Sequence, residues 1–363
     1  MKIAQIAPLI ESVPPRLYGG TERIASYLTE ELVRQGHDVT LFASGDSITS
    51  AKLVPCCAQA LRLNPSVRDP IPYYMLMLDR VRRMQADFDI LHFHIDQFHF
   101  PIFSGTGRPT LTTLHGRQDL TDLHQLYRGF PDMALVSISD AQRKPIPFAN
   151  FAATIYHGLP PLYKPTFEPR GGYLAFLGRI APEKRVDRAI AIAQAVGLPL
   201  RIAAKVDRVD EEYFRNEIQP LLKSPAVEFI GEIDDRKKAS FLGEARALLF
   251  PIDWPEPFGL VMIEAMACGT PVLAFRQGSV PEIIDDGVTG FVVDSIEQAI
   301  ARMDRLLTLD RRQVRARFDE RFSVRRMALD YVKTYRKLIH DRQVEAVTPT
   351  LSMPSGKPEP AIH

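Results

Sequence analysis

The sequence predicts an α/β protein with two successive parallel-sheet units that face a ligand-binding crevice. Short strand-like runs alternate with amphipathic helical patterns along most of the chain. The segment 161–172, which holds three prolines and two glycines, interrupts this alternation near the middle. The length of 363 residues is enough for two or three domains, each with its own core.

The first unit opens with a strand, a loop, a helix and a second strand. An apolar run at 2–9 predicts a buried strand, and the loop at 11–20 is rich in Pro and Gly. A helical pattern covers 21–35, with Thr21 as its expected N-cap and Gly36 as its stop signal. The same rhythm continues with a helix at 73–85 and with strands at 37–43, 90–94, 110–114 and 134–138.

The second unit repeats this pattern after the break. We expect strands at 173–177, 200–204, 227–230, 247–250, 271–275 and 291–293, and helices at 186–196, 211–222, 237–245 and 260–267. In doubly wound sheets, ligands bind in the crevice outside the carboxyl ends of the strands. The functional residues are therefore expected in the loops that follow the strands.

Composition narrows the class of protein. The chain is 45% hydrophobic and 25% charged with a formal net charge of +1, which argues against a nucleic-acid binder held by a general basic field. Its three cysteines follow neither a zinc pattern nor a disulfide framework, so a reducing cytoplasm is the expected compartment. We find no apolar run of the ~20 residues that a membrane span requires.

Two glutamates frame the start of the helix expected at 260–267. Glu256 lies just before this start, and Glu264 lies within the helix. The free N–H groups of a helix N-terminus attract anionic or oxygen-rich ligands, and carboxylates are strong acceptors for paired sugar hydroxyls. Taken alone, Glu256 is more typical of a capping acid, and Glu264 of a solvated helix residue, than of a ligand-binding group.

Two cationic residues and a pair of glycines lie in other loops that are expected at the carboxyl ends of the strands. Arg179 and Lys184 follow the strand that ends at 177, and they could neutralise a diphosphate, although exposed loop cations are an equal alternative. Gly19 and Gly20 precede a helix and allow close approach of the backbone to a ligand.

The string from Pro255 to Pro271 resembles the Glu-x7-Glu motif of the family 4 retaining glycosyltransferases. The segment from Gly178 to Lys184 resembles the Gly-Arg-x-x-x-x-Lys segment of the same family. The resemblance extends to about Ile339 and implies the GT-B fold, in which two Rossmann-like doubly wound domains face a deep cleft. It also implies metal-independent transfer of a hexose from a nucleotide diphosphate sugar, with retention of the anomeric configuration.

The resemblance also implies roles for single residues. Glu256 would contact the donor sugar and Glu264 the ribose. The backbone amides of the helix start would hold sugar and phosphate oxygens, and those amides belong to Phe258, Gly259 and Leu260.

On the remaining walls of the cleft, Arg179 and Lys184 would grip the diphosphate, and the loop with Gly19 and Gly20 would close over it. His115 would contact the sugar 6-hydroxyl. The backbone beside Ile233 would read the base.

A cluster of histidines precedes His115. His92, His94 and His99 lie close in sequence to Asp96, which leaves two interpretations open. A metal site is the disfavoured one, because His92 and His94 alternate along a strand and share one face. We therefore expect no metal and place His94 and Asp96 on the acceptor side. His157 stands where the family has Asn, which weakens the resemblance at that position.

The resemblance divides the chain into an acceptor-side domain at 1–165, a nucleotide-sugar domain at 166–325, a helix at 326–345 that crosses back to the first domain, and a disordered tail at 346–363. An arginine-rich stretch covers 311–326. We interpret it as a solvated helical surface, with a membrane-surface contact as the alternative.

The function predicted from the sequence is transfer of a hexose to a hydroxyl acceptor without a cofactor. UDP-glucose is the preferred donor and GDP-mannose the second. The acceptor is a glycan, a lipid-linked sugar or a small molecule, in the cytoplasm or at the inner face of the membrane. No obligate protein partner and no nucleic acid are expected. We expect this transfer to serve polysaccharide or glycoconjugate synthesis. The alternatives are an epimerase or an inverting transferase on the same fold, or a non-enzymatic nucleotide-sugar-binding protein.

Overall fold

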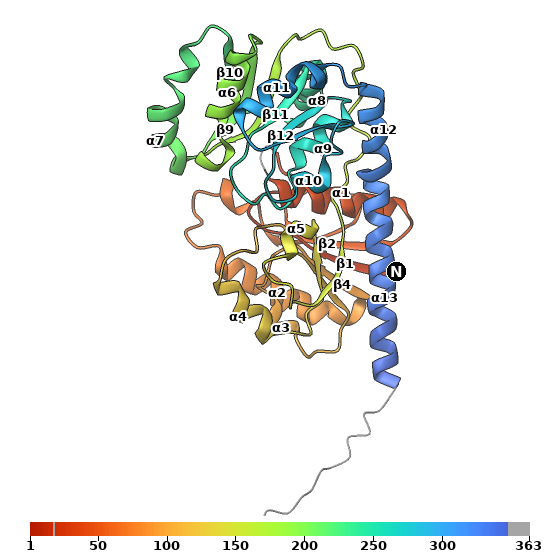
Figure 1. Cartoon of the computed structure of the whole chain (residues 1–363). Helices are drawn as coiled ribbons and strands as arrows, with labels where there is room; N and C mark the ends of the chain where they lie inside the picture. The colour runs from red at the N-terminus through yellow and green to blue at the C-terminus, as the bar shows by residue number, and fades with distance from the viewer. Residues whose placement is uncertain (17–18, 348–363) are drawn as a thin grey trace, which may run out of the picture.

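Two parallel β-sheets, one in each half of the chain, form the framework of the protein. The computed structural model describes residues 1–16 and 19–347. A seven-stranded sheet has the order β3-β2-β1-β4-β5-β6-β7, and a six-stranded sheet has the order β10-β9-β8-β11-β12-β13. Helices cover both sheets, and the two units are stacked one above the other (Figure 1). This arrangement confirms the predicted fold class.

The first unit has its switch point between the parallel neighbours β1 and β4, because the strands that follow β1 extend the sheet on one side and those that follow β4 extend it on the other. Its strands are β1 Lys2–Ile6, β2 Asp38–Ser44, β3 Lys52–Cys57, β4 Ile90–Phe93, β5 Thr110–Thr113, β6 Leu135–Ser137 and β7 Phe151–Thr154. Its helices are α1 Gly20–Arg34, α2 Ile71–Met84, α3 Phe100–Phe103, α4 Asp122–Gly129 and α5 Asp140–Arg143. The sequence did not predict β3 or β7, both of which are edge strands.

The second unit follows the predicted order of elements closely. Its strands are β8 Leu174–Ile180, β9 Leu200–Val206, β10 Val227–Gly231, β11 Ala247–Phe250, β12 Val272–Phe275 and β13 Gly290–Val293. Its helices are α6 Val186–Ala195, α7 Glu211–Tyr213, α8 Asp235–Glu244, α9 Leu260–Ala267, α10 Val280–Ile283 and α11 Ile296–Leu307. The helix predicted at 211–222 is broken after α7 into a π-helical turn and a 3-10 turn, with Pro220, which lacks an N–H donor, between them.

The last two helices join the units. α12 Arg311–Arg321 packs against α9, and α13 Val324–Val347 runs back along the first unit (Figure 1). Tyr331 and Tyr335 of α13 are fully buried in a core cluster with Ile3 and Ile24. α13 thus connects the end of the second unit to the core of the first. Most of the tail expected at 346–363 lies outside the described residues.

The arginine-rich stretch is only partly the solvated surface that the sequence indicated. Arg312, Arg317 and Arg325 are exposed, whereas four other arginine side chains donate to backbone carbonyl oxygens. Arg311 donates to the carbonyls of Thr166, Gly243 and Ala245. Arg315 reaches Tyr163 and Ala267, Arg321 reaches Glu282 and Ile283, and Arg326 reaches Tyr156 and His157. A guanidinium group has five N–H donors, so one arginine side chain can donate to several backbone carbonyl oxygens at the same time.

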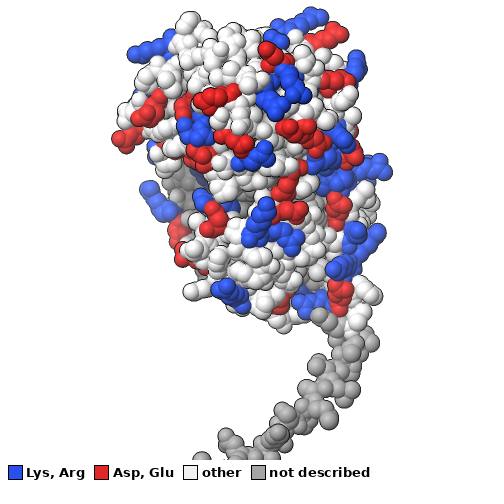
Figure 2. Space-filling model, viewed as in Figure 1, with Lys and Arg blue, Asp and Glu red and all other residues white. Residues whose placement is uncertain are grey.

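Charges of both signs are interspersed over the face shown in Figure 2. Within the described residues, no helix is both long and apolar enough to cross a membrane.

A carboxylate of the second unit binds the first unit directly. Glu282 in α10 accepts hydrogen bonds from the backbone N–H groups of Asp140 and Ala141 at 2.7 and 2.6 Å. It also accepts one from the Tyr156 hydroxyl at 3.1 Å. These charge-assisted bonds clamp the start of α5 to α10 across the junction.

We expect Glu282→Ala to lower the free energy of unfolding by about 1–2 kcal/mol, because three donors lose a charged acceptor. Chemical denaturation measures this loss, and small-angle X-ray scattering should show a larger radius of gyration. The control is Glu320→Ala, which removes an exposed pair with Arg317 and should cost less than about 0.5 kcal/mol. Equal effects of the two variants would rule out the clamp.

Candidate functional site

A cavity of about 520 Å³ lies between the two units, at the carboxyl ends of their central strands. The first unit contributes Gly19, Gly20 and His115 to its wall. The second unit contributes a larger set from β8, from α9 and from the loops after β8, β10 and β11, namely Arg179, Lys184, Ile233, Glu256, Phe258, Gly259, Leu260 and Glu264. The structure thus brings together all but two of the site residues proposed from the sequence.

Two helix N-termini without a capping side chain face this cavity. α1 begins after Gly19 and α9 after Gly259, and neither start has a side-chain cap among the described residues. The predicted N-cap Thr21 is wrong, because α1 already begins at Gly20. A Cβ built on Gly20 would lie 3.6 Å from Leu260 Cδ1, so the two helix starts are close neighbours.

Helix starts of both kinds occur elsewhere in the described chain. Four helices have a side chain that accepts from their first turn, and these caps are Ser139, Asp234, Ser295 and Asp310. Six other helices, α2, α3, α4, α6, α7 and α10, start without such a cap. The starts of α1 and α9 differ from these in lining the cavity, where their amides can bind an oxygen-rich or anionic ligand.

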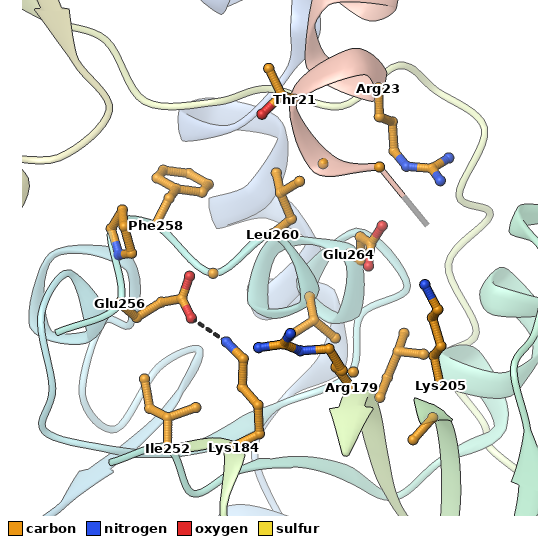
Figure 3. Close-up of a pocket in the computed structure, with 18 of the residues that line it drawn as sticks. Thr21, Arg23, Arg179, Lys184, Lys205, Ile252, Glu256, Phe258, Leu260 and Glu264 are labelled. Atoms are coloured by element: carbon orange, nitrogen blue, oxygen red, sulfur yellow. Dashed lines mark hydrogen bonds and ion pairs between the residues drawn. The ribbon is translucent and has the colours of Figure 1, made fainter. Parts of the chain in front are cut away.

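Gly259 is required by the backbone at the start of α9. Its φ of +81° lies in the left-handed region, and a Cβ there would come within 2.6 Å of Met262 Cε. The glycine thus lets the chain turn sharply from the loop after β11 into α9. This turn places Glu256 and Glu264 on the same cavity (Figure 3).

Lys184 and Glu256 form an ion pair inside the cavity. Lys184 Nζ lies 2.7 Å from Glu256 Oε2, and Trp254 Nε1 donates to the same oxygen at 2.9 Å. The ammonium group also lies 4.6 Å from the centre of the Trp254 ring, within the range of a cation–π contact. Figure 3 shows the two side chains pointing toward one another.

Arg179 is surrounded by carboxylates. Its Nη2 lies 2.6 Å from Glu183, and its Nη1 lies 3.5 Å from Asp207 and 3.8 Å from Asp210. Lys205, which the sequence did not single out, pairs with Asp207 at 2.7 Å and lines the cavity with Arg179. Three cationic side chains thus lie close to the cavity: Arg179 at the end of β8, Lys205 at the end of β9 and Lys184 after β8.

Glu264 is buried on the inner wall of the cavity. It accepts from the Tyr163 hydroxyl at 2.9 Å and pairs with Lys238 Nζ at 3.2 Å. Burial acts to raise the pKa of Glu264, but Lys238 and Arg23 together hold that pKa below its usual value. Glu264 is therefore an ionised acceptor at neutral pH. The sequence did not identify Tyr163 or Lys238, which lie in the hinge and in α8 without a recognisable motif.

His115 lines the cavity, but the proposed acceptor-side residues do not. His94 is buried behind His115, with its Nδ1 2.9 Å from His115 Nε2. Asp96 has a positive φ of 50° and is exposed outside the cavity wall. The expectation that His94 and Asp96 contact the acceptor is therefore corrected: both ring nitrogens of the buried His94 are bonded within the protein, to Gln5 and His115. The first unit's wall is instead lined by Glu11, Glu22 and Arg62, none of them predicted.

Within the described part of the chain, no group of three His, Cys, Asp or Glu side chains is arranged to hold a metal ion. The ring nitrogens of His92 are bonded to Tyr335 and Thr113, and those of His94 to Gln5 and His115. All three cysteines are free thiols.

Comparison with known proteins agrees with this architecture. The model described as Glycosyltransferase Family 4 matches residues 18–201, and the one described as Glycosyl transferases group 1 matches residues 164–322. The phosphatidyl-myo-inositol mannosyltransferase of Mycolicibacterium smegmatis is 26% identical over 373 residues, which cover 90% of this chain and 89% of that protein.

Solved structures share the fold at lower identity. Sucrose-phosphate synthase from Thermosynechococcus elongatus has a TM-score of 0.77 at 19% identity, covering 94% of this chain and 100% of that chain. Anabaena HepE in complex with UDP-glucose has a TM-score of 0.69 at 18% identity, covering 93% and 100%. The chain belongs to glycosyltransferase family 4 and is a transferase enzyme with the GT-B fold.

Proposed function

We propose that this glycosyltransferase moves a hexose from a nucleotide diphosphate sugar to a hydroxyl acceptor, with retention of configuration and without a metal ion. The observation that carries the proposal is the convergence of two uncapped helix starts and three cations on one cavity. A diphosphate is the ligand that this set of donors fits, because its oxygens accept from amides, guanidinium and ammonium groups alike.

The cations have a second task when the glycosidic bond breaks. Negative charge then grows on the departing diphosphate, and Arg179 and Lys184 lie where they can stabilise it. Both are paired with carboxylates of the chain, which keeps them in place before a donor enters. Fixed cations need no reorganisation during the reaction, and they can replace a metal ion in this role.

The proposed sugar position lies between Glu256 and His115, which come from opposite walls of the cavity. In front-face displacement, the acceptor oxygen forms a bond to the anomeric carbon on the side from which the diphosphate leaves. The bond between this carbon and the phosphate oxygen breaks, and that phosphate oxygen takes the proton of the acceptor hydroxyl. Configuration is retained, and the chain supplies orientation and charge stabilisation.

We propose two nucleotide sugars as the hexose donor, each supported by a different observation. UDP-glucose is our first proposal, supported by the HepE complex with UDP-glucose on the same fold. GDP-mannose is the second, supported by the mannosyltransferase relatives and by Glu232 beside Ile233 in the cavity wall. A carboxylate can accept from two adjacent N–H groups of guanine, whereas uracil offers one. A thermal-shift panel of UDP, GDP and their sugars separates the two.

The acceptor site is proposed on the first unit's wall, where Glu11 and Arg62 form an ion pair of 2.9 Å. The relatives named for phosphatidyl-myo-inositol support a lipid-linked acceptor at the inner face of the membrane, and the free thiols agree with a cytoplasmic site of action. A glycan or small-molecule acceptor remains the alternative. Analysis of the product anomer by NMR tests retention, since an inverting transferase gives the opposite anomer and an epimerase releases no glycoside.

Replacing Lys184 with Ala should lower kcat by about 10²–10³-fold, because one preorganised charge opposite the leaving group is lost. Donor turnover, measured by nucleotide release, tests this effect. Lys52→Ala is the matched control, because Lys52 is exposed on the edge strand β3. Unchanged turnover of a stably folded Lys184→Ala enzyme would refute the role of Lys184.

Exhaustive treatment with EDTA should leave turnover within about twofold of the untreated enzyme, because fixed cations provide the charge stabilisation. The same assay after addition of Mg²⁺ or Mn²⁺ is the companion measurement. Loss of activity with EDTA and its recovery with either ion would overturn metal independence.

Gly278→Ala should reduce kcat/KM through displacement of Glu256. Gly278 has a φ of +51°, and a Cβ there would lie 2.3 Å from the carbonyl oxygen of Glu256. Gly197→Ala is the control, because Gly197 also has a positive φ of +68° but nothing within 4 Å of the added Cβ. We expect both variants to lose about 1 kcal/mol of stability from backbone strain, and Gly278→Ala alone to lose activity. Equal activity of the two variants contradicts this prediction.

A further inference from the structure

A chain of buried hydrogen bonds leads from the crossing helix α13 to His115 at the cavity. Gln5 Nε2 donates to the Tyr335 hydroxyl at 3.1 Å, and Gln5 Oε1 lies 2.8 Å from His94 Nε2. His94 Nδ1 in turn lies 2.9 Å from His115 Nε2. Gln5, His94 and Tyr335 are all buried, and they come from β1, from the loop after β4 and from α13.

The chemistry of the groups gives this chain a direction. The amide oxygen of Gln5 can only accept, so the proton of His94 must be on Nε2. A neutral imidazole has one donor and one acceptor, so His94 Nδ1 accepts and His115 Nε2 donates to it. The proton of the neutral His115 ring is thereby placed on Nε2, and Nδ1 keeps its lone pair.

Tyr335 holds the Gln5 amide in the orientation on which this direction depends. Its hydroxyl oxygen lies 2.6 Å from His92 Nδ1 and also forms the hydrogen bond with Gln5 Nε2. When the hydroxyl donates to His92, its oxygen is free to accept from Gln5. His92 Nε2 then donates to Thr113 Oγ1 at 2.7 Å, and Thr113 donates to the Tyr331 hydroxyl at 2.8 Å. With the Gln5 amide in this orientation, one arrangement of protons satisfies every hydrogen bond of the network.

Burial keeps the rings neutral. It lowers the pKa of His94 well below its ordinary value and the pKa of His115 to about 3. Because Nε2 of His115 is committed to His94, Nδ1 is the nitrogen that no described residue engages. His115 therefore presents a hydrogen-bond acceptor to the cavity, and it carries no positive charge there.

We propose that Gln5, His94 and Tyr335 are positioning residues that hold His115 with its proton on Nε2, so that its Nδ1 accepts from a hydroxyl of the donor sugar and rejects a carboxylate. This inference rests on the proposed function, because a donor hexose is the group that meets His115. A sugar hydroxyl can donate to a bare ring nitrogen. The carboxylate of a uronic acid has no proton to donate. Its oxygen and His115 Nδ1 would both be hydrogen-bond acceptors and would repel each other.

The test uses two tyrosines of the same helix, one turn apart and equally buried. Tyr335→Phe removes the hydroxyl that orients Gln5, so both orientations of the amide become accessible. Tyr331→Phe removes a hydroxyl bonded to Thr113, which is connected to Gln5 only through Thr113, His92 and Tyr335 and has no direct contact with the amide. With the donor that the thermal-shift panel selects, we expect about a tenfold loss of kcat/KM for Tyr335→Phe and less than a twofold loss for Tyr331→Phe.

The spectroscopic measurement does not depend on turnover. In ¹⁵N-histidine-labelled full-length enzyme, long-range ¹H–¹⁵N spectra distinguish the two neutral tautomers, and a His115→Gln variant identifies the signals of His115. In the wild-type enzyme we expect His115 to show a protonated Nε2 and a bare Nδ1. The same tautomer should be present in Tyr331→Phe. In Tyr335→Phe we expect a mixture of this tautomer with the other one. The ratio of kcat/KM for the hexose donor to that for its uronic acid counterpart should fall in Tyr335→Phe.

A wild-type spectrum with the proton on Nδ1, or equal behaviour of the two tyrosine variants, overturns the positioning role. The spectrum of the wild-type enzyme decides this even where Tyr335→Phe does not fold. If no nucleotide sugar binds or reacts while the expected tautomer is seen, the proposed function fails and the hydrogen-bond direction stands. If donors react normally but the tautomer is wrong, the inference fails and the proposed function stands.

Discussion

The convergence of two helix starts on one cavity is the constraint on which the rest of the site depends. α1 and α9 belong to different sheets, yet Gly20 and Leu260 are neighbours because the units face each other. Each uncapped start leaves backbone donors without an intrahelical partner, and burying such donors without a ligand or water is costly. Other helices of this protein also start without a side-chain cap, but those of α1 and α9 face the same cavity, so one ligand can reach the donors of both.

The electrostatics of the cavity follow from the same arrangement. Cations at the ends of β8 and β9 would repel one another and the positive ends of the helix dipoles if they stood alone. Glu256, Glu183 and Asp207 offset this repulsion and hold each cation in a defined place. The buried Glu264 remains ionised only because Lys238 and Arg23 lie close to it. The site is thus a balanced set of charges whose members constrain each other before any ligand binds.

Local signals in the sequence predicted part of this site, and long-range contacts account for what was missed. The helix at 260–267 and its two framing glutamates were predicted because glycine, apolar residues and acids follow one another within a short segment. Lys238, Tyr163 and Arg23 were missed because their shared partner Glu264 is distant in the chain. The arginines of α12 looked solvated because no sequence pattern shows the carbonyl oxygens that they reach. β3 was missed because Pro55, which is tolerated at a sheet edge, argues against a strand when only the sequence is seen.

The junction between the units also limits how they can move. The chain crosses the junction at Leu159 and again at Ser323, and hydrogen bonds join the two crossings. The Leu159 N–H donates to the Phe322 carbonyl at 2.8 Å, and the Val324 N–H donates to the Leu159 carbonyl at 2.9 Å. A Cβ on Gly158 would lie 2.4 Å from the carbonyl oxygen of Ser323, so only glycine permits this contact. Since α13 is packed into the core of the first unit, it must move with that unit. A rotation about the paired crossings would leave the network from Tyr335 to His115 intact, while Glu256 and Lys184 would move together on the other side. Such a rotation would also have to break the bonds of Glu282 to Asp140 and Ala141.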